Sequence, residues 1–390
     1  MAKQTSAGLP ALHNPSPEKK AKIEATASES VPASSSVGST GSGRYTATMD
    51  TLRETLQTYG VAVLPSVLNA TECTAMVAGM WDYLETVSRD FKPLSDGTPG
   101  QPIHRDHKDT WKSLQQLYPR QRILQQFGIG HAQMSWDLRQ NPKVIAPFSE
   151  IWRTKASQLL TSFTGASFVM PPEITGYGWD DGRADWHTDQ SYTRNGFECI
   201  QSWVTAFDVS EGDATLAVLE GSHKFHGAFR QAMKQKKTDT DSNVVDFKRP
   251  SVVSKVESKD DWFKLNDEHV AWYKQHGCIP AYIACPAGSM VLWDSRTIHY
   301  GRAPTKGRVS QDHLRCVSFV CMTPRSSCSS ANLKKRIQAF ESMRTTSHWP
   351  HTPKLNPTAP RIWGRQLPSM NSIPKPQLNA IGRRLVGYDK

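Results

Sequence analysis

Residues 286–301 have the sequence PAGSMVLWDSRTIHYG, and this stretch decides which fold the chain can adopt. Pro286 and Gly288 mark a turn, and Ser289–Trp293 then predict a short apolar strand. A polar corner follows at 294–297, after which His299 stands at a strand-like end. Apolar strands joined by tight turns, with a histidine where a new strand starts, indicate a β-rich core that carries a site.

The rest of the second half of the chain has the same pattern of short apolar strands and turns. Short apolar segments alternate with Gly, Pro and Asp, and the candidate strands are Ser167–Met170, Ile200–Asp208, Thr215–Leu219, Tyr282–Cys285, Ser289–Trp293 and Arg315–Met322. Many short strands separated by turn residues are typical of a sandwich or jelly roll. Residues 45–166 predict mostly helices around one strand at Val61–Leu64. We therefore expect an all-β core with flanking helices, an α+β fold built on a jelly roll.

Composition divides the chain into three predicted parts. Residues 1–44 are rich in Ser, Ala, Pro, Gly and Thr, which predicts a disordered tail because such a segment buries too little apolar surface. Residues 45–325 predict the main folded domain, with a jelly-roll core at about 167–325 and a polar inserted loop at 228–262. Residues 326–390 predict a basic extension packed on the core through apolar side chains, namely Leu333, Ile337, Phe340, Trp349 and Trp363.

The positive charge of the chain is concentrated at its ends. The net charge is +11, and residues 331–390 hold eleven basic and two acidic side chains. Residues 1–44 hold five basic and three acidic ones, so residues 45–330 are neutral. A neutral centre does not support a nucleic-acid groove around a catalytic core. A small-molecule substrate is favoured, although contact between the basic extension and an anionic partner stays open.

The sequence also bounds where the protein works. It has no apolar run of membrane-spanning length and no apolar signal core near Met1. Its seven cysteines form no CxxC pair, which favours reduced thiols over disulfides or a zinc site. We expect an intracellular protein without membrane attachment. The cluster Lys19–Lys22 resembles a short nuclear-import signal, so cytoplasm and nucleus both stay open, as does the oligomeric state.

The motif that carries chemistry is WHTDQ at residues 186–190. On an extended strand His187 and Asp189 point the same way, because side chains alternate with a period of two. One imidazole nitrogen and one carboxylate oxygen can then reach a single metal ion. A second such triplet, His104-Arg105-Asp106, is interpreted as a chance occurrence, because its helical surroundings would turn the two side chains apart.

Two residues downstream complete a candidate site. His299 can supply the third ligand of a two-histidine, one-carboxylate iron(II) centre, an arrangement that leaves positions for co-substrate and oxygen. Arg315 opens an alternating apolar strand sixteen residues later. A buried guanidinium matches a carboxylate with two parallel hydrogen bonds, as the far end of a dicarboxylic 2-oxo acid would require.

In combination, these motifs resemble the phytanoyl-CoA dioxygenase family of iron(II)- and 2-oxoglutarate-dependent oxygenases. The resemblance covers roughly residues 50–325. The stretches that carry it are YGVAVLPSVL at 59–68, the WHTDQ motif, IQSWVTAFD at 200–208, AVLEGSH at 217–223, and the strands around His299 and Arg315.

The resemblance implies a double-stranded β-helix and a complete catalytic centre. It places Fe(2+) on His187, Asp189 and His299, and the distal carboxylate of 2-oxoglutarate on Arg315. It also implies that Trp203 lines the 2-oxoglutarate pocket. The implied activity hydroxylates or otherwise oxidises a C–H bond with O2, releasing succinate and CO2.

Two departures from the family pattern leave alternatives. Glu220 stands where the family has proline, which we expect to be structural. Arg302-Ala-Pro304 replaces a small-residue stretch after the distal histidine, so Arg308, nine residues past His299, competes with Arg315 for 2-oxoglutarate. Two other functions also stay open: an oxygenase that acts on nucleic acid or a nuclear protein, and a non-catalytic jelly-roll binding protein.

Overall fold

The computed structural model describes residues 43–117, 123–194, 196–239, 256–359 and 368–389. Several predicted features therefore lie wholly or mainly outside the described residues: the tail at 1–44, apart from its last two residues, the Lys19–Lys22 cluster, most of the second half of the inserted loop, and Trp363. Within the part that is described, no helix is long and apolar enough to cross a membrane.

Ten of the strands form two five-stranded sheets, and two more form a separate pair. The first sheet has the order β1-β9-β5-β11-β3, the second β7-β4-β10-β6-β8, and the pair is β12-β2. The strands are β1 Val61–Leu64, β2 Leu159–Thr161, β3 Ala166–Val169, β4 His187–Thr188, β5 Ile200–Thr205, β6 Thr215–Glu220, β7 Phe263–Lys264, β8 Ile279–Tyr282, β9 Met290–Asp294, β10 His299–Arg302, β11 Arg315–Phe319 and β12 Met322–Pro324.

The strand order is that of a jelly roll. Eight strands form the core, and numbering β3, β4, β5, β6, β8, β9, β10 and β11 from 1 to 8 gives the orders 6-3-8-1 and 2-7-4-5 in the two sheets. Successive strands thus alternate between the sheets over most of the chain, which is the pattern of a double-stranded β-helix. The predicted fold class is confirmed.

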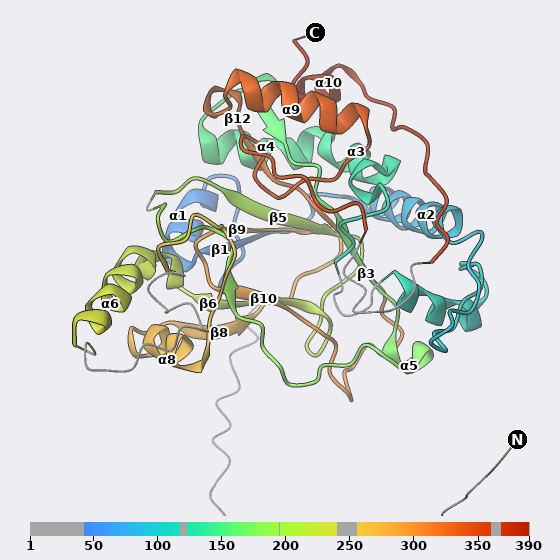
Figure 1. Ribbon diagram of the computed structural model, residues 1–390, viewed down its shortest axis with the longest axis horizontal. Helices are drawn as coiled ribbons and strands as arrows, with labels where there is room; N and C mark the ends of the chain where they lie inside the picture. Colours follow the sequence, from blue (N-terminus) through green and yellow to red (C-terminus); the bar gives the residue numbers. More distant parts are fainter. Residues whose placement is uncertain (1–42, 118–122, 195, 240–255, 360–367, 390) are drawn as a thin grey trace, which may run out of the picture. The chain divides into compact units, whose positions relative to one another are not determined.

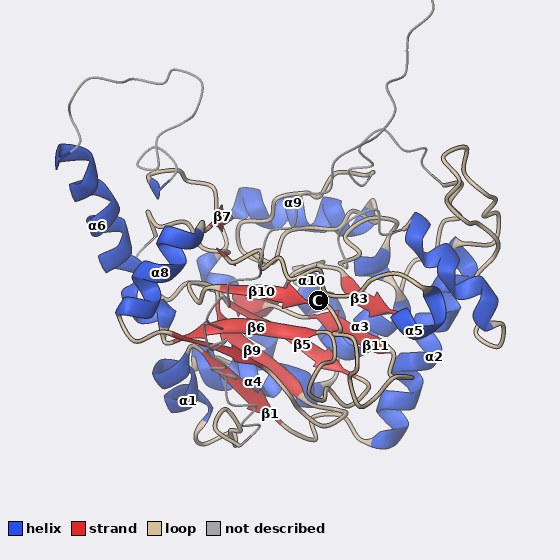
Figure 2. Cartoon of the chain, turned by 90° about the horizontal axis from the view of Figure 1, so that it is seen from below, coloured by secondary structure: helices blue, strands red, loops and turns tan. Residues whose placement is uncertain are grey.

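Alternating side chains divide the apolar residues among three layers. Val63, Val291 and Val317 lie between the two sheets with Leu216 and Val218 of the second sheet. The outer face of the first sheet packs against the N-terminal helices, and the outer face of the second sheet packs against α6 and α8 (Figure 2). Because both faces are covered, β5 and β9 are buried along their whole length.

The helices lie outside the two sheets (Figure 1). They are α1 Leu52–Tyr59, α2 Ala70–Val87, α3 Gln133–Arg139, α4 Pro142–Trp152, α5 Pro172–Thr175, α6 His226–Asp239, α8 Asp267–Gln275, α9 Ser330–Glu341 and α10 Ala380–Val386. In Figure 1, α9 and α10 lie beside α3 and α4, so helices far apart in the sequence share one side of the first sheet.

Local sequence signals explain the first two helices. Gly60 ends α1 with a left-handed backbone at φ 79°, which glycine adopts without steric cost. Asn69 accepts a hydrogen bond from the backbone of Glu72, whose carboxylate accepts one from Asn69 N in return. This reciprocal capping box begins α2.

The structure differs from the sequence prediction at three elements. Residues 228–239 belong to α6 and not to a loop, because Phe229 and Met233, four residues apart, bury the same face. Strand β8 begins three residues before the predicted Tyr282, since an edge strand tolerates Pro280. The expected strand 315–322 is split, and its end pairs with β2 as β12.

The C-terminal residues contact the core through more than apolar side chains. Phe340 and Trp349 are buried, whereas Leu333 and Ile337 are only partly buried. Arg336 is fully buried and donates hydrogen bonds to the carbonyls of four residues, namely Thr161, Pro350, Leu385 and Val386. The extension also contains α10, which contacts β2. The proposed three-part division of the chain stays a prediction.

Candidate metal centre

The two histidines of the predicted site face each other across a strand pair. His187 in β4 and His299 in β10 are register partners, and their ring centroids lie 4.5 Å apart. Their neighbours Trp186 and Tyr300 point to the outer apolar layer, so both histidines point between the sheets. A direct cross-strand pair brings two imidazoles to one point although 111 positions of chain separate them.

Both imidazoles are oriented by backbone carbonyls. Nδ1 of His187 lies 2.6 Å from the carbonyl of Asp185, and Nδ1 of His299 lies 2.8 Å from that of Thr297. Each Nδ1–H donates to its carbonyl, which fixes the tautomer and leaves Nε2 as the lone-pair donor. This is how ligating histidines are commonly held.

Asp189 is the third candidate ligand. It lies just past the two-residue strand β4, and its carboxylate oxygens lie 3.9 Å from Nε2 of His187 and 3.3 Å from Nε2 of His299. Gln201 in β5 donates a hydrogen bond of 3.1 Å to this carboxylate. One ligand atom from each of the three residues lies within 4.8 Å of the others.

The protonation states suit a divalent cation. Burial, together with the nearby His299, lowers the pKa of His187 to about 4. Burial by itself would raise the pKa of Asp189, but the neighbouring histidines His348, His299 and His187 hold it well below its usual range. At neutral pH His187 is therefore neutral and Asp189 is ionised, as metal ligands must be. Two imidazoles and a carboxylate fit iron(II).

Gly60 helps to place His299. A Cβ atom added at Gly60 would lie 2.5 Å from Nδ1 of His223 and 2.6 Å from Oγ1 of Thr297. The Thr297 hydroxyl donates to the Gly60 carbonyl, and the Thr297 carbonyl accepts from His299. The left-handed glycine therefore allows the corner before β10 to approach closely. His223 is a structural residue here, with Nε2 3.1 Å from the carbonyl of Gln57.

Arg315 and Trp203 lie together on neighbouring strands. β11 pairs with β5, and Cζ of Arg315 lies 5.4 Å from the centre of the Trp203 ring. Arg315 also donates a hydrogen bond to the carbonyl of Ala214. Trp203 belongs to the apolar layer between the sheets, as does Trp293, whose ring centroid is 5.5 Å from that of His299. Neither indole N–H has an acceptor among the described residues.

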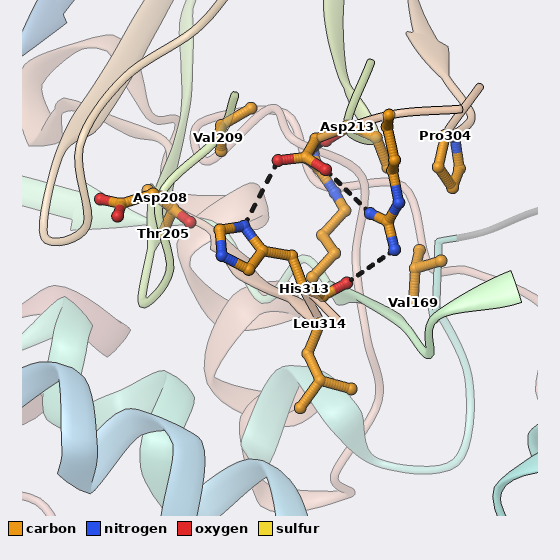
Figure 3. A pocket seen from close by; sticks show the side chains of 11 residues that line it. Val169, Thr205, Asp208, Val209, Asp213, Pro304, His313 and Leu314 are labelled. Atoms are coloured by element: carbon orange, nitrogen blue, oxygen red, sulfur yellow. Dashed lines mark hydrogen bonds and ion pairs between the residues drawn. The ribbon is translucent and has the colours of Figure 1, made fainter. Parts of the chain in front are cut away.

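Arg308, the competing arginine, is engaged in ion pairs. Its guanidinium contacts Asp213 at 2.8 Å and Glu173 at 3.0 Å, and its side chain is 2% exposed. Asp213 also faces His313 across 3.5 Å, as the close-up shows (Figure 3). Arg308 and Arg315 both line this small pocket. This buried cation, with two carboxylate partners, ties α5, which carries Glu173, to the turn that carries Asp213.

The departures from the family pattern and the chance triplet also have structural explanations. Glu220 accepts a hydrogen bond from Tyr45 at 2.6 Å and pairs with Arg44, tying the chain before β1 to β6. Arg302 pairs with Asp180 at 3.0 Å. His104 and Asp106 lie in an exposed turn, so the predicted helical surroundings of this triplet were wrong. Among the described residues, only His187, Asp189 and His299 form a cluster of three such ligands.

His348 supports Asp189 and was not predicted from the sequence. Nε2 of His348 lies 3.2 Å from the backbone carbonyl of Asp189, in the segment after α9. Nothing in the sequence around His348 marks it, because its partner is 159 residues away. Gln201 could have been found, since it alternates with Trp203 and so shares its face of β5.

Comparison with known proteins agrees with this geometry. A family model described as phytanoyl-CoA dioxygenase (PhyH) matches residues 56–308, about two thirds of the chain. The chain belongs to this family. Its members are iron(II)- and 2-oxoglutarate-dependent oxygenases, so the family resemblance seen in the motifs is confirmed. The match includes all three candidate ligands and ends before Arg315 and the C-terminal extension.

Individual relatives share little sequence identity with this chain. Ava biosynthesis cluster protein O of Aspergillus versicolor is 24% identical over 227 residues, which are 58% of this chain and 65% of that protein. The chain thus matches less than two thirds of that relative's length. HygX of Streptomyces hygroscopicus, solved with nickel and 2-oxoglutarate, is 12% identical over 71% of this chain and 87% of its own, with a TM-score of 0.39. GlcNAc Inducible Gene 2 of Candida albicans is 11% identical over 87% of this chain and 77% of its own, with a TM-score of 0.47.

Proposed function

We propose that this chain is an iron(II)- and 2-oxoglutarate-dependent oxygenase that oxidises a C–H bond of a small molecule. The observation that carries the proposal is the cross-strand pair His187 and His299 with the Asp189 carboxylate between them. Iron(II), with 2-oxoglutarate and O2, would supply the oxidant for the C–H bond, and succinate and CO2 would be released. The protein's residues hold the metal, bind the co-substrate and exclude water.

Each ligand has a defined supporting contact in this proposal. The carbonyls of Asp185 and Thr297 hold the two imidazoles with Nε2 directed to the metal. Gln201 holds one oxygen of Asp189 and so restrains the carboxylate. Such contacts orient ligands before a metal arrives, which raises affinity.

We assign the distal carboxylate of 2-oxoglutarate to Arg315 and one wall of its pocket to Trp203. Three observations support this assignment: Arg315 lies over Trp203, the Trp203 indole N–H has no acceptor among the described residues, and Arg308 is paired with two acids. A guanidinium and an indole N–H together suit an anionic co-substrate.

The site favours a small molecule over a macromolecule as substrate. The side chains of His187, Asp189 and His299 are only 18%, 16% and 5% exposed, so a substrate must reach between the sheets. The nucleic-acid alternative is weakened further because several basic side chains of the extension already have partners within the chain: Arg336, Arg344, Lys354 and Lys375.

The decisive experiment measures succinate formed from 2-oxoglutarate by the full chain reconstituted with iron(II). We expect succinate that depends on iron and oxygen and is absent in the Asp189→Ala variant. Succinate formation with nucleic acid alone as the stimulating partner would favour the second hypothesis. A chain that binds iron and 2-oxoglutarate but forms no succinate would be a jelly-roll binding protein.

A further inference from the structure

One large aromatic side chain is exposed beside the metal ligands. Trp262 is 58% exposed, the highest value among the exposed aromatic side chains of the described residues. Its ring centroid lies 6.0 Å from that of His187, with the planes inclined by 37°. Among the described residues, His187 is the one aromatic ring that the indole meets. An indole left this exposed loses the free energy of burial unless something covers it.

The backbone next to Trp262 explains why the indole lies on the metal side of the sheet. β7 pairs with β4 so that Lys264 faces His187 and Phe263 faces Thr188. Phe263 is buried in the outer apolar layer. Because side chains alternate, Trp262 and Lys264 take the opposite face, which is the face of His187.

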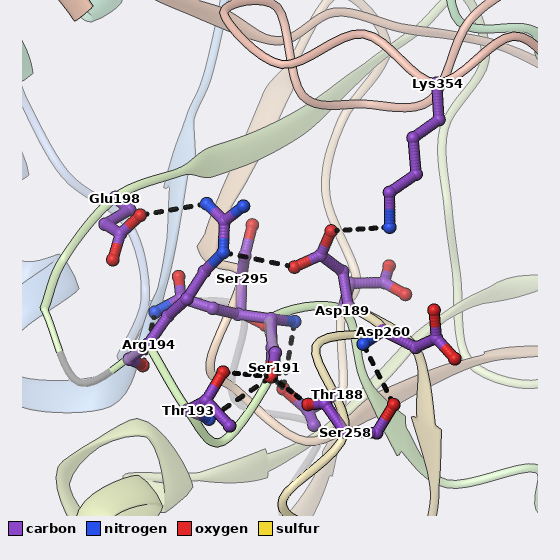
Figure 4. Close-up of polar contacts among 12 residues, drawn as sticks. Thr188, Asp189, Ser191, Thr193, Arg194, Glu198, Ser258, Asp260, Ser295 and Lys354 are labelled. Carbon is purple, nitrogen blue, oxygen red and sulfur yellow. Dashed lines mark hydrogen bonds and ion pairs between the residues drawn. The ribbon is translucent and has the colours of Figure 1, made fainter.

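The backbone just before Trp262 is held by contacts of the neighbouring residues. The buried carboxylate of Asp261 contacts Arg194 at 3.5 Å and Lys354 at 3.3 Å. Arg194 and Lys354, both labelled in Figure 4, make these two ion pairs from different segments of the chain. The Ser191 hydroxyl donates to the carbonyl of Ser258 at 2.5 Å. These contacts join the turn before β7 to the loop after Asp189 and to the C-terminal extension.

Several charged groups at this rim are paired with one another, although Lys259 and Asp260 are exposed. Lys264 contacts Asp185, Arg194 contacts Glu198 as well as Asp261, and Lys354 contacts Asp261. Paired charges offer little to an ionic substrate, whereas the exposed indole face offers a flat polarisable surface. Offset or edge-on packing against another π-system is favourable beyond the area that it buries.

We propose that Trp262 is a substrate platform that stacks on a neutral, planar, unsaturated ring and so places a neighbouring C–H bond at the metal. This inference rests on the proposed function and adds the chemical class of the substrate. Trp262 is a positioning residue, because it touches the substrate's ring and not the reacting bond. Trp262 would select rings by shape. The metal would be held by His187, Asp189 and His299.

The test uses the full chain labelled with 5-fluorotryptophan and loaded with zinc(II) and 2-oxoglutarate, which cannot react. The fluorine resonance of Trp262 is assigned from the Trp262→Phe variant, and Trp272, partly buried against His276, serves as the control ring. The probes are 2-naphthol and its saturated counterpart decahydro-2-naphthol. We expect 2-naphthol to shift the Trp262 resonance saturably and decahydro-2-naphthol to shift it little. Neither probe should shift the Trp272 resonance appreciably.

Variants give the second measurement. Trp262→Ala should weaken 2-naphthol binding about tenfold, and Trp262→Phe should restore most of it. Zinc and 2-oxoglutarate affinities should stay as in the parent chain. Equal responses to both probes, no response to either, or a loss of zinc affinity in Trp262→Ala would overturn the platform. Failure of the parent chain to bind zinc would count against the proposed metal centre alone.

Discussion

His187 and His299 are direct partners across the antiparallel strands β4 and β10, and their ring centroids lie 4.5 Å apart. A strand pair fixes such partners through backbone hydrogen bonds, so the sheet register by itself brings the two imidazoles together. Asp189 completes it from the first position after β4. The expected consequences concern the ligands, the co-substrate, the extension and the pH dependence of folding.

Removing either histidine of the pair should abolish tight metal binding. His299→Ala and His187→Ala each delete one nitrogen ligand, and we expect the affinity for cobalt(II) to fall by more than about 100-fold. Loss of a residue that only supports a ligand lowers metal affinity about 10- to 100-fold, so the loss of a ligand should exceed that. The measurement is a spectroscopic cobalt(II) titration. His104→Ala, at the exposed turn, is the matched control and should bind cobalt(II) as the parent chain does.

Replacing Arg315 should affect the co-substrate and spare the metal. Arg315→Ala should raise the KM for 2-oxoglutarate about 10- to 100-fold, because hydrogen bonds to a charged partner are lost. Arg308→Ala should instead lower the urea midpoint of unfolding, since it leaves Asp213 and Glu173 without their cation. The reverse pattern of KM and midpoint would transfer the 2-oxoglutarate role to Arg308.

His348 should tune metal affinity from outside the ligand set. It lies 3.2 Å from the backbone carbonyl of Asp189, and His348→Ala should lower cobalt(II) affinity about tenfold by loosening that peptide. His348→Gln, which keeps a donor, should recover part of the loss. An unchanged titration in both variants would limit His348 to packing.

Arg336 should be needed for stability. Its guanidinium donates to four backbone carbonyls, three of them in the C-terminal extension and one in β2. Arg336→Ala leaves these carbonyls buried without donors, which should cost about 3 kcal/mol or more of unfolding free energy. Lys335→Ala, at the exposed neighbouring position of α9, is the control and should change the urea midpoint little.

Acid should destabilise the metal-free protein through His131. Burial lowers the pKa of His131 from 6.5 to about 4 in the folded state. The unfolded chain therefore binds more protons between these two values, so stability falls as the pH falls through this window and is constant above it. From pH 7 to pH 5 the loss should be about 1–2 kcal/mol.

The check on this pH dependence is a pair of variants followed by urea unfolding at several pH values. His131→Gln removes one titrating group while keeping a donor near the Arg344 carbonyl, and should make the slope shallower, whereas His187 and His226 keep part of it. His104→Gln, which changes an exposed histidine, should leave the slope unaltered. Equal slopes in the parent chain and the His131 variant would refute the assignment.

The sequence by itself determined the features whose causes are local. Gly60 ends α1 because only glycine adopts its backbone angle freely, and Asn69 with Glu72 begins α2 because both partners of the cap lie within three residues. Alternation predicted that His187 and Asp189 would reach one metal, even though the strand proved to be only two residues long. The jelly roll followed from many short strands with turns between them.

Only the tertiary structure decided which distant residues meet. The pairing of His187 with His299 depends on sheet register, and Arg308 has its ion pairs only because the fold brings Glu173 and Asp213 to it. His348 and Trp262 reach the metal centre from segments with no motif of their own. Contacts of this kind depend on how strands order within two sheets and on which side chain fills the space between segments. Neither is encoded in a short stretch of sequence, because each depends on many weak contacts satisfied together.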